Sequence, residues 1–229
     1  MVSNRKIGAK KGIETKRINR LLSMEEKIRS EKGIENIAGV DEAGRGPLAG
    51  PVVAAACMLP KGVALKGIND SKKLIFEKRY ELYKELIQHP DICYAVGIIE
   101  PYEIDELNIH QASLKAMVAA VSRLSKKPDY LLVDGRARIS VEDIPCEAIV
   151  DGDYLSYCIA AASIIAKVTR DHIMMGYHDL YPQYGFCDHK GYGTAQHLQA
   201  LQVYGPCPIH RRSFGLLKGE EYQEVQHHD

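Results

Sequence analysis

The sequence predicts a mixed α/β domain, and three observations lead to this prediction. Short apolar segments typical of buried strands alternate with longer segments whose apolar residues recur at helical spacing. Glycine, proline or acidic residues follow several predicted strands, as expected where strands end in loops. The chain has 229 residues and a hydrophobic content of 45%, which is enough for one sizeable core and a small appendage.

Composition excludes several classes of protein. The 30 basic and 30 acidic residues balance, so a site for a polyanion must be a local patch. The six cysteines are scattered without a C-x-x-C pair, which favours reduced thiols over disulfides or a zinc site. No apolar segment is long enough for a secretory signal or a transmembrane helix. We therefore expect a cytoplasmic protein that does not enter a membrane.

Residues 1–35 are predicted to form a basic extension that contains one helix. Ile18, Leu21 and Ile28 recur at helical spacing between residues 14 and 32, and Lys and Arg outnumber Glu in this region. Two interpretations remain open, a solvated basic helix or an auxiliary contact with nucleic acid.

The elements after residue 36 follow from local patterns. Apolar runs between turn-forming segments indicate strands, and apolar residues three or four apart indicate helices. Asn69, Asp70 and Ser71 supply N-cap chemistry ahead of one helix. Small residues on one face of residues 156–176 would let that helix pack closely on a sheet. The predicted strands are residues 37–40, 52–59, 93–99, 130–135 and 146–150, and the predicted helices are residues 74–86, 110–125, 156–176 and 194–203.

Residues 39–51 combine two features that suggest chemistry on a phosphodiester. Asp41 and Glu42 are adjacent carboxylates that follow a short apolar run. The loop behind them is rich in Gly and Pro, and Gly permits close approach of a ligand. Arg45 in this loop carries a planar fork of donors that suits phosphate.

Acids also follow two other predicted strands, at Asp134 and at the Asp151 and Asp153 pair. Ligands gather at the carboxyl ends of strands in α/β sheets, so we expect these acids to converge with Asp41 and Glu42. Several carboxylates in one pocket require cations, and Mg²⁺ or Mn²⁺ suits all-oxygen ligation. For any single acid, the alternative is a helix cap or a turn residue.

Residues 39–51 resemble the signature of the type 2 ribonuclease H family, and of bacterial ribonuclease HII in particular. Further family motifs follow in the family order. They are residues 70–74 (DSKKL), 133–135 (VDG), 152–153 (GD), 159–171 (IAAASIIAKVTRD), 189–194 (HKGYGT) and His197. The resemblance spans about residues 36–215, which we predict to be the catalytic domain, and leaves residues 216–229 as a polar tail.

The resemblance implies a ribonuclease H-like fold, with a central mixed sheet flanked by helices and a helical C-terminal portion. It implies an endonuclease that cuts the RNA strand of RNA/DNA hybrids and incises 5′ of single ribonucleotides embedded in duplex DNA. The expected products carry 3′-hydroxyl and 5′-phosphate ends, and the expected nucleophile is a water activated by divalent metal, Mn²⁺ or Mg²⁺. We expect a monomer.

Roles for individual residues are likewise implied by the resemblance. Asp41 and Asp134 are the expected central metal ligands, and Glu42 and Asp153 complete the site. Asp151 is expected to be a spectator because the family usually has a non-acidic residue there. A tyrosine is expected to stack on the next deoxyribose and, with the glycine loop, to sense the 2′-hydroxyl. The expected metal ligands are Asp41, Glu42, Asp134 and Asp153; the expected substrate contacts are Gly44, Arg45, Gly46 and Tyr192 at the 2′-hydroxyl, and Ser71, Lys72 and Thr194 at phosphates.

Other interpretations were weighed against this one. A ribonuclease HIII is disfavoured by the Gly-Arg-Gly loop and by the short N-terminal region. A hybrid-binding protein without catalysis is disfavoured because all four acids are present. A phosphatase for small substrates is disfavoured because no P-loop or phospho-acceptor motif is found. His189, His197 and His210 resemble no compact metal motif, so a structural or exposed role is favoured.

Overall fold

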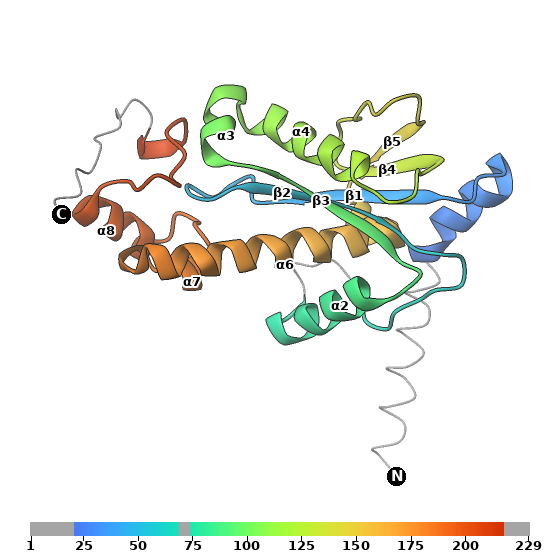
Figure 1. Cartoon of the computed structure of the whole chain (residues 1–229), viewed down its shortest axis with the longest axis horizontal. Helices are drawn as coiled ribbons and strands as arrows, with labels where there is room; N and C mark the ends of the chain where they lie inside the picture. The colour runs from blue at the N-terminus through green and yellow to red at the C-terminus, as the bar shows by residue number, and fades with distance from the viewer. Residues whose placement is uncertain (1–20, 69–73, 218–229) are drawn as a thin grey trace, which may run out of the picture.

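Figure 1 shows the computed structural model, which describes residues 21–68 and 74–217. Ser71 and Lys72, two of the predicted phosphate contacts, lie outside the described residues, as do most of the basic extension and the polar tail. In the described part of the chain, no helix is both long and apolar enough to cross a membrane.

A five-stranded sheet forms the middle layer, with the strand order β3-β2-β1-β4-β5 (Figure 1). The strands β1, β2 and β3 pair antiparallel, whereas β1, β4 and β5 run parallel. The result is the mixed sheet that the sequence predicted. The strands are β1 (Ile37–Ala43), β2 (Val52–Met58), β3 (Cys93–Ile99), β4 (Tyr130–Asp134) and β5 (Cys146–Ile149).

The parallel half of the sheet places three acid-bearing segments at one edge. In the pairing of β1 with β4, Val40 lies opposite Val133, so Asp41 and Asp134 follow at neighbouring positions. In the pairing of β4 with β5, Asp134 lies opposite Ile149. Parallel strands bring their carboxyl ends to the same edge of a sheet.

The predicted end of β1 at Val40 was wrong. The strand continues to Ala43 because Asp41 pairs with Ala55 and Glu42 with Ala54 on the antiparallel neighbour β2. The two carboxylates therefore sit on regular strand backbone and not in the glycine loop. Successive strand residues point to opposite faces, so the two side chains leave the strand in different directions.

Helices cover both faces of the sheet (Figure 1). α4 and residues of β1, β2 and β4 form one apolar core, to which Ile104 of α3 also contributes. α6 and α2 cover the opposite face in a second core, where the small residues of α6 allow close packing. The helices are α2 (Phe76–Gln88), α3 (Pro101–Leu107), α4 (Ile109–Ser122), α5 (Gly152–Leu155), α6 (Tyr157–Leu180), α7 (Phe186–His189) and α8 (Ala195–Tyr204), with 3₁₀ turns η1 (Pro182–Tyr184) and η2 (Gly215–Leu217).

Short helices account for the main differences from the sequence-based prediction. α3 was not predicted, because Pro101 suggested the end of a strand and not the first turn of a helix, where proline is also favoured. Asn108 separates α3 from α4 with a positive φ of 68°, and its side chain accepts hydrogen bonds from the first amides of α4. α5 and α7 are single turns with too little periodicity to detect.

Residues 21–32 form a helix that packs against the apolar cores around α6 and β1. Leu21 and Ile28 are buried, and Glu25 is only 1% exposed. Glu25 Oε1 accepts hydrogen bonds from Ser156 Oγ at 2.7 Å and from the amide of Cys158 at 2.9 Å. A carboxylate at the N-terminus of α6 is favoured by the helix dipole. This helix is therefore part of the packed structure that holds α6 in place.

Candidate active site

Asp41 lies at the centre of a group of carboxylates. It is buried, with 4% of its surface exposed. Burial raises the pKa of the Asp41 carboxyl well above its usual range, and the carboxylates of Glu42 and Asp134 raise it further. A hydrogen bond from the Ser163 side chain opposes this rise, as does one from the Glu42 amide at 2.7 Å. The fold thus brings three of the four predicted acids together.

Asp134 connects these acids to the segment after β5. Its Oδ1 accepts a hydrogen bond of 2.7 Å from the amide of Gly152. A Cβ at Gly152 would lie 2.6 Å from Ile159 Cδ1, so a side chain there would force the contact apart. Asp153 follows in the first turn of α5 and is buried, whereas Asp151 is exposed. The two acids of this segment therefore differ in their environment.

The donor set fits a divalent cation. Carboxylate oxygens are the ligands that Mg²⁺ and Mn²⁺ prefer, and a cation would offset the repulsion that raises the pKa of Asp41. Among the described residues, no three His, Cys, Asp or Glu side chains are already arranged as a metal-binding group. Mg²⁺ commonly uses one or two carboxylates with waters and substrate phosphates, so such a site does not require a closed protein cage.

A pocket of about 230 Å³ opens beside the acids. Glu42 links the pocket to the acids, and its Oε1 lies 3.3 Å from Arg45 Nη1. Tyr192 faces the same pocket and is 45% exposed, which leaves its ring accessible to a substrate. The pocket is lined by Glu42, Ala43, Gly44, Arg45, Gly46, Ser163, Lys167, Arg170 and Tyr192.

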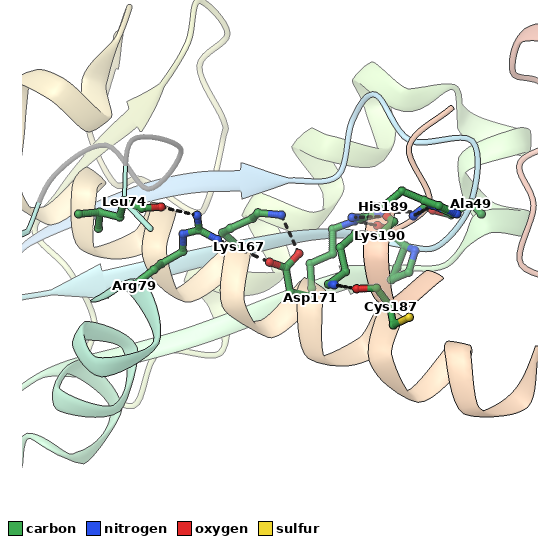
Figure 2. A network of polar contacts seen from close by, with 11 residues as sticks. Ala49, Leu74, Arg79, Lys167, Asp171, Cys187, His189 and Lys190 are labelled. Carbon is green, nitrogen blue, oxygen red and sulfur yellow. Dashed lines mark hydrogen bonds and ion pairs between the residues drawn. The ribbon is translucent and has the colours of Figure 1, made fainter. Parts of the chain in front are cut away.

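Lys167 is the ammonium group of this pocket, and a polar network holds it (Figure 2). Its Nζ lies 2.6 Å from Asp171 Oδ1, and Asp171 Oδ2 lies 3.7 Å from Arg79 Nη1. Arg79 also donates to the carbonyl of Leu74 at 2.7 Å. Burial lowers the pKa of Lys167, and the Asp171 carboxylate opposes that change. The network ties α2 to the pocket side of α6.

Two loops from distant parts of the chain meet at the pocket. The amide of Leu48 donates to the carbonyl of Gly191 at 2.8 Å. A Cβ at Gly191 would lie 2.5 Å from the carbonyl oxygen of Ala49, so glycine is required for this approach. Arg170, which is buried, donates to the carbonyl of Ala49 and to that of Lys190, both at 3.0 Å. The loop after β1 and the loop carrying Tyr192 are thus joined.

The three histidines to which the sequence assigned no definite role form a buried cluster under Tyr192. His197 Nδ1 lies 2.9 Å from the carbonyl of Tyr192, and His197 Nε2 lies 2.9 Å from His210 Nε2. The amide of Cys207 donates to His210 Nδ1 at 3.0 Å. The carbonyl of Tyr192 requires a proton on His197 Nδ1, so His197 Nε2 accepts and His210 Nε2 donates. His189 stacks on His197 with ring centroids 4.5 Å apart.

The ribonuclease HII family model matches residues 38–217, a span that includes every acid and loop of the candidate site. A ribonuclease HII of Caldanaerobacter subterraneus subsp. tengcongensis is 54% identical to the chain over 210 residues. That match covers 90% of this chain and 85% of the relative. The chain belongs to the ribonuclease HII family. The resemblance predicted from the sequence motifs is confirmed.

Solved structures agree with the fold. The ribonuclease H2 of Pyrococcus horikoshii OT3 superposes with a TM-score of 0.68 at 29% identity, covering 80% of this chain and 95% of that chain. The fold also extends to Bst-RNase HIII in a structure with Mn²⁺, with a TM-score of 0.54, 18% identity, and coverage of 76% and 71%. The ribonuclease H-like α/β fold expected of a ribonuclease HII is confirmed.

Thr194, predicted as a phosphate contact, has a local structural role. It is the N-cap of α8, and its Oγ1 accepts a hydrogen bond from the amide of His197 at 3.3 Å. The residue is exposed, so its hydroxyl proton remains available for a phosphate.

Several residues of the ribonuclease HII pocket were not predicted as site residues. Ser163, Lys167 and Arg170 recur at positions i, i+4 and i+7 of α6, so they share one helix face. That polar stripe beside the apolar face of the helix is a signal that the sequence contained. Arg211 carried no such signal, because it acts on a loop more than 160 positions earlier in the chain.

Proposed function

We propose that this ribonuclease HII, which cleaves RNA in RNA/DNA hybrids and at embedded ribonucleotides, incises duplex DNA on the 5′ side of a single ribonucleotide. One observation carries the proposal: Glu42, the neighbour of Asp41 in the group of acids, and the glycine loop line the same pocket. Glu42 neighbours Asp41 on β1, and lines the pocket together with Gly44, Gly46 and Tyr192. A group that binds metal and a group that senses a sugar therefore lie within one substrate-sized space.

In this proposal Asp41, Glu42, Asp134 and Asp153 hold Mg²⁺ or Mn²⁺. The support is the burial of Asp41 and Asp153, and the repulsion that raises the pKa of Asp41. When bound, divalent ions activate a water and stabilise the leaving oxygen of a phosphodiester. The acids supply oxygen ligands, and Ser163 and the Glu42 amide orient the Asp41 carboxylate.

Recognition of the ribonucleotide is assigned to Gly44, Arg45, Gly46 and Tyr192. Gly46 is exposed, and the nearest heavy atom to a Cβ there would be Tyr192 Cε1 at 3.7 Å. The backbone of Gly46 therefore lies close to the tyrosine ring, and both are exposed where a substrate could reach them. The 2′-hydroxyl is the group that distinguishes RNA from DNA, and a glycine backbone allows its close approach. Ser71, Lys72 and Thr194 are proposed to contact phosphates.

The reaction is a hydrolysis. The oxygen of a water forms a bond to phosphorus, and the bond from phosphorus to the 3′-oxygen of the upstream nucleotide breaks. The leaving oxygen takes a proton and becomes a 3′-hydroxyl, while the ribonucleotide keeps a 5′-phosphate. No covalent intermediate with a side chain is required.

The test uses a DNA duplex with one ribonucleotide, incubated with the purified protein and Mg²⁺ or Mn²⁺. We expect a single incision on the 5′ side of the ribonucleotide and no incision of the matched all-DNA duplex. Ligation after removal of the ribonucleotide flap maps the 3′-hydroxyl end. Intact substrate under both metals would overturn the proposal. Cleavage restricted to substrates with several consecutive ribonucleotides would favour a ribonuclease HIII-like specificity.

A further inference from the structure

Arg211 is a buried cation whose guanidinium lies over the Phe214 ring and donates all its hydrogen bonds to the loop after β1. It is fully buried, at 0% exposure. Its Nε donates to the carbonyl of Gly50 at 2.9 Å, its Nη1 to that of Arg45 at 3.0 Å, and its Nη2 to that of Gly44 at 2.6 Å. The planar fork of a guanidinium is the side chain that can hold three carbonyls at once.

The position is electrostatically unfavourable for an arginine. Among the described residues, Arg211 has no carboxylate within ion-pair distance. Burial, together with the charge of Arg170, lowers the pKa of the Arg211 guanidinium to about 9. An apolar side chain of similar size would avoid this desolvation. The three carbonyl contacts are therefore what the guanidinium provides here.

These contacts determine which way two peptide units face. The C=O and N–H of a trans peptide point in opposite directions, and no cis peptide occurs in the described chain. The carbonyls of Gly44 and Arg45 point down to Arg211, so the amides of Arg45 and Gly46 point away from it. Neither amide donates a hydrogen bond to any of the described residues.

The residues that carry these outward amides, Arg45 and Gly46, line the pocket together with Gly44. Two consecutive free N–H groups form a concave donor pair that suits an oxygen acceptor. The Arg45 side chain does not compete for this space as a free cation, because it pairs with Glu42 at 3.3 Å.

We propose that Arg211 is a positioning residue for ribonucleotide recognition, which aims the amides of Arg45 and Gly46 at the 2′-oxygen by holding the carbonyls of Gly44 and Arg45 beneath the loop. This inference rests on the proposed function of the 44–46 loop. Arg170 has a different part: it holds the carbonyls of Ala49, Pro51 and Lys190, and none at residues 44–46.

The test compares Arg211→Lys with the neighbouring control Arg212→Lys. A lysine keeps the charge but cannot hold three carbonyls in a fork. Equilibrium binding is measured with Ca²⁺ in place of Mg²⁺, for a duplex with one ribonucleotide and for the matched all-DNA duplex. The readout is the dissociation constant for the all-DNA duplex divided by that for the ribonucleotide duplex. This ratio reports recognition of one hydroxyl, because contacts common to both duplexes cancel.

We expect Arg211→Lys to lower this ratio about tenfold, the effect of one or two misaligned hydrogen bonds, with unchanged affinity for the all-DNA duplex. Arg212→Lys should keep the wild-type ratio. An unchanged ratio in Arg211→Lys, or an equal loss of affinity for both duplexes, would overturn the inference. A wild-type protein that binds both duplexes equally would refute the proposed function of the loop and the inference with it.

A second variant covers the case in which Arg211→Lys does not fold. Arg211→Met removes the buried charge together with all three donors, and its folding is checked by circular dichroism. A folded Arg211→Met that retains the wild-type ratio contradicts the inference, and one that loses it supports the inference.

Discussion

The Nε2 atoms of His197 and His210 lie 2.9 Å apart in the buried cluster beneath Tyr192. At this separation one nitrogen carries a proton and the other accepts it, so the pair is neutral. Protonation of His197 at Nε2 would leave two N–H groups facing each other, and protonation of His210 at Nδ1 would remove the acceptor of the Cys207 amide. The tyrosine loop therefore rests on a pair of histidines that tolerates a single arrangement of protons.

Stability should fall in mild acid because of this pair. Burial, followed by the proximity of His197, lowers the pKa of His210 to about 3 from a usual value near 6.5. Between these values the unfolded chain binds a proton that the folded chain does not, so the free energy of unfolding falls as pH falls. The slope is about 1.4 kcal/mol per pH unit. Urea unfolding at pH 7 and pH 5 should show about 2 kcal/mol more loss for wild type than for His210→Gln. Parallel pH curves for the two proteins would contradict this.

Two isosteric variants should separate the two contacts of His197. In His197→Asn the side-chain amide occupies the place of Nδ1 and still donates to the Tyr192 carbonyl, whereas in His197→Gln it occupies the place of Nε2 and reaches only His210. If the contact with Tyr192 matters for substrate, His197→Asn should retain several-fold more incision activity than His197→Gln. In a Tyr192→Ala background the two variants should become equal, and a persistent difference there would refute the link to Tyr192.

Asp134→Asn should abolish cleavage without unfolding the protein. Asparagine keeps Oδ1, which still accepts from the Gly152 amide, but it removes a negative charge from the proposed metal site. We expect incision to fall on the order of 10³-fold while hybrid binding remains measurable. Titration with Mn²⁺ followed by calorimetry should show weaker metal binding. Activity that survives the substitution would show the metal assignment to be wrong.

Gly44→Ala should lower the stability of the protein, whereas Gly46→Ala should lower its incision activity. Gly44 has a φ of +99°, and a Cβ there would lie 2.2 Å from Arg170 Nε, so we expect a loss of about 2 kcal/mol of stability or more. Gly46 lacks a positive φ, and its Cβ would only approach Tyr192 at 3.7 Å. Gly46→Ala should therefore fold normally but lose ribonucleotide incision. Thermal melts combined with incision rates check both, and a normal incision rate in Gly46→Ala would contradict the assignment of this space to the ribose.

Glu25→Ala should destabilise the protein by about 1–3 kcal/mol in urea unfolding. The substitution leaves Ser156 Oγ and the Cys158 amide without their buried acceptor at the start of α6. Glu26→Ala is the matched control, because that side chain is exposed. Equal stability of the two variants would show that residues 21–32 contribute little to holding α6.

Local pattern located the strands and the acids that follow them, and the family resemblance selected the four candidate metal ligands. Asp134 ends a short apolar strand, and the fold places it beside Asp41 because β1 and β4 are parallel neighbours. Local pattern failed where pairing decided the outcome: β1 extends past Val40 because β2 supplies partners as far as Ala43. The role of Arg211 was beyond reach for the same reason, since its partners depend on the tertiary fold.

The large separation in sequence between Arg211 and the carbonyls that it holds bears on the order of assembly. Gly44, Arg45 and Gly50 precede it by 167, 166 and 161 positions. Synthesis runs from the N-terminus, so all four acids leave the ribosome well before this arginine. A nascent chain that ends before residue 211 would contain all four acids, but its 44–46 loop would lack the hydrogen bonds from Arg211. With Arg211 in its proposed role, recognition of the ribonucleotide would become complete only after all the acids have been synthesised.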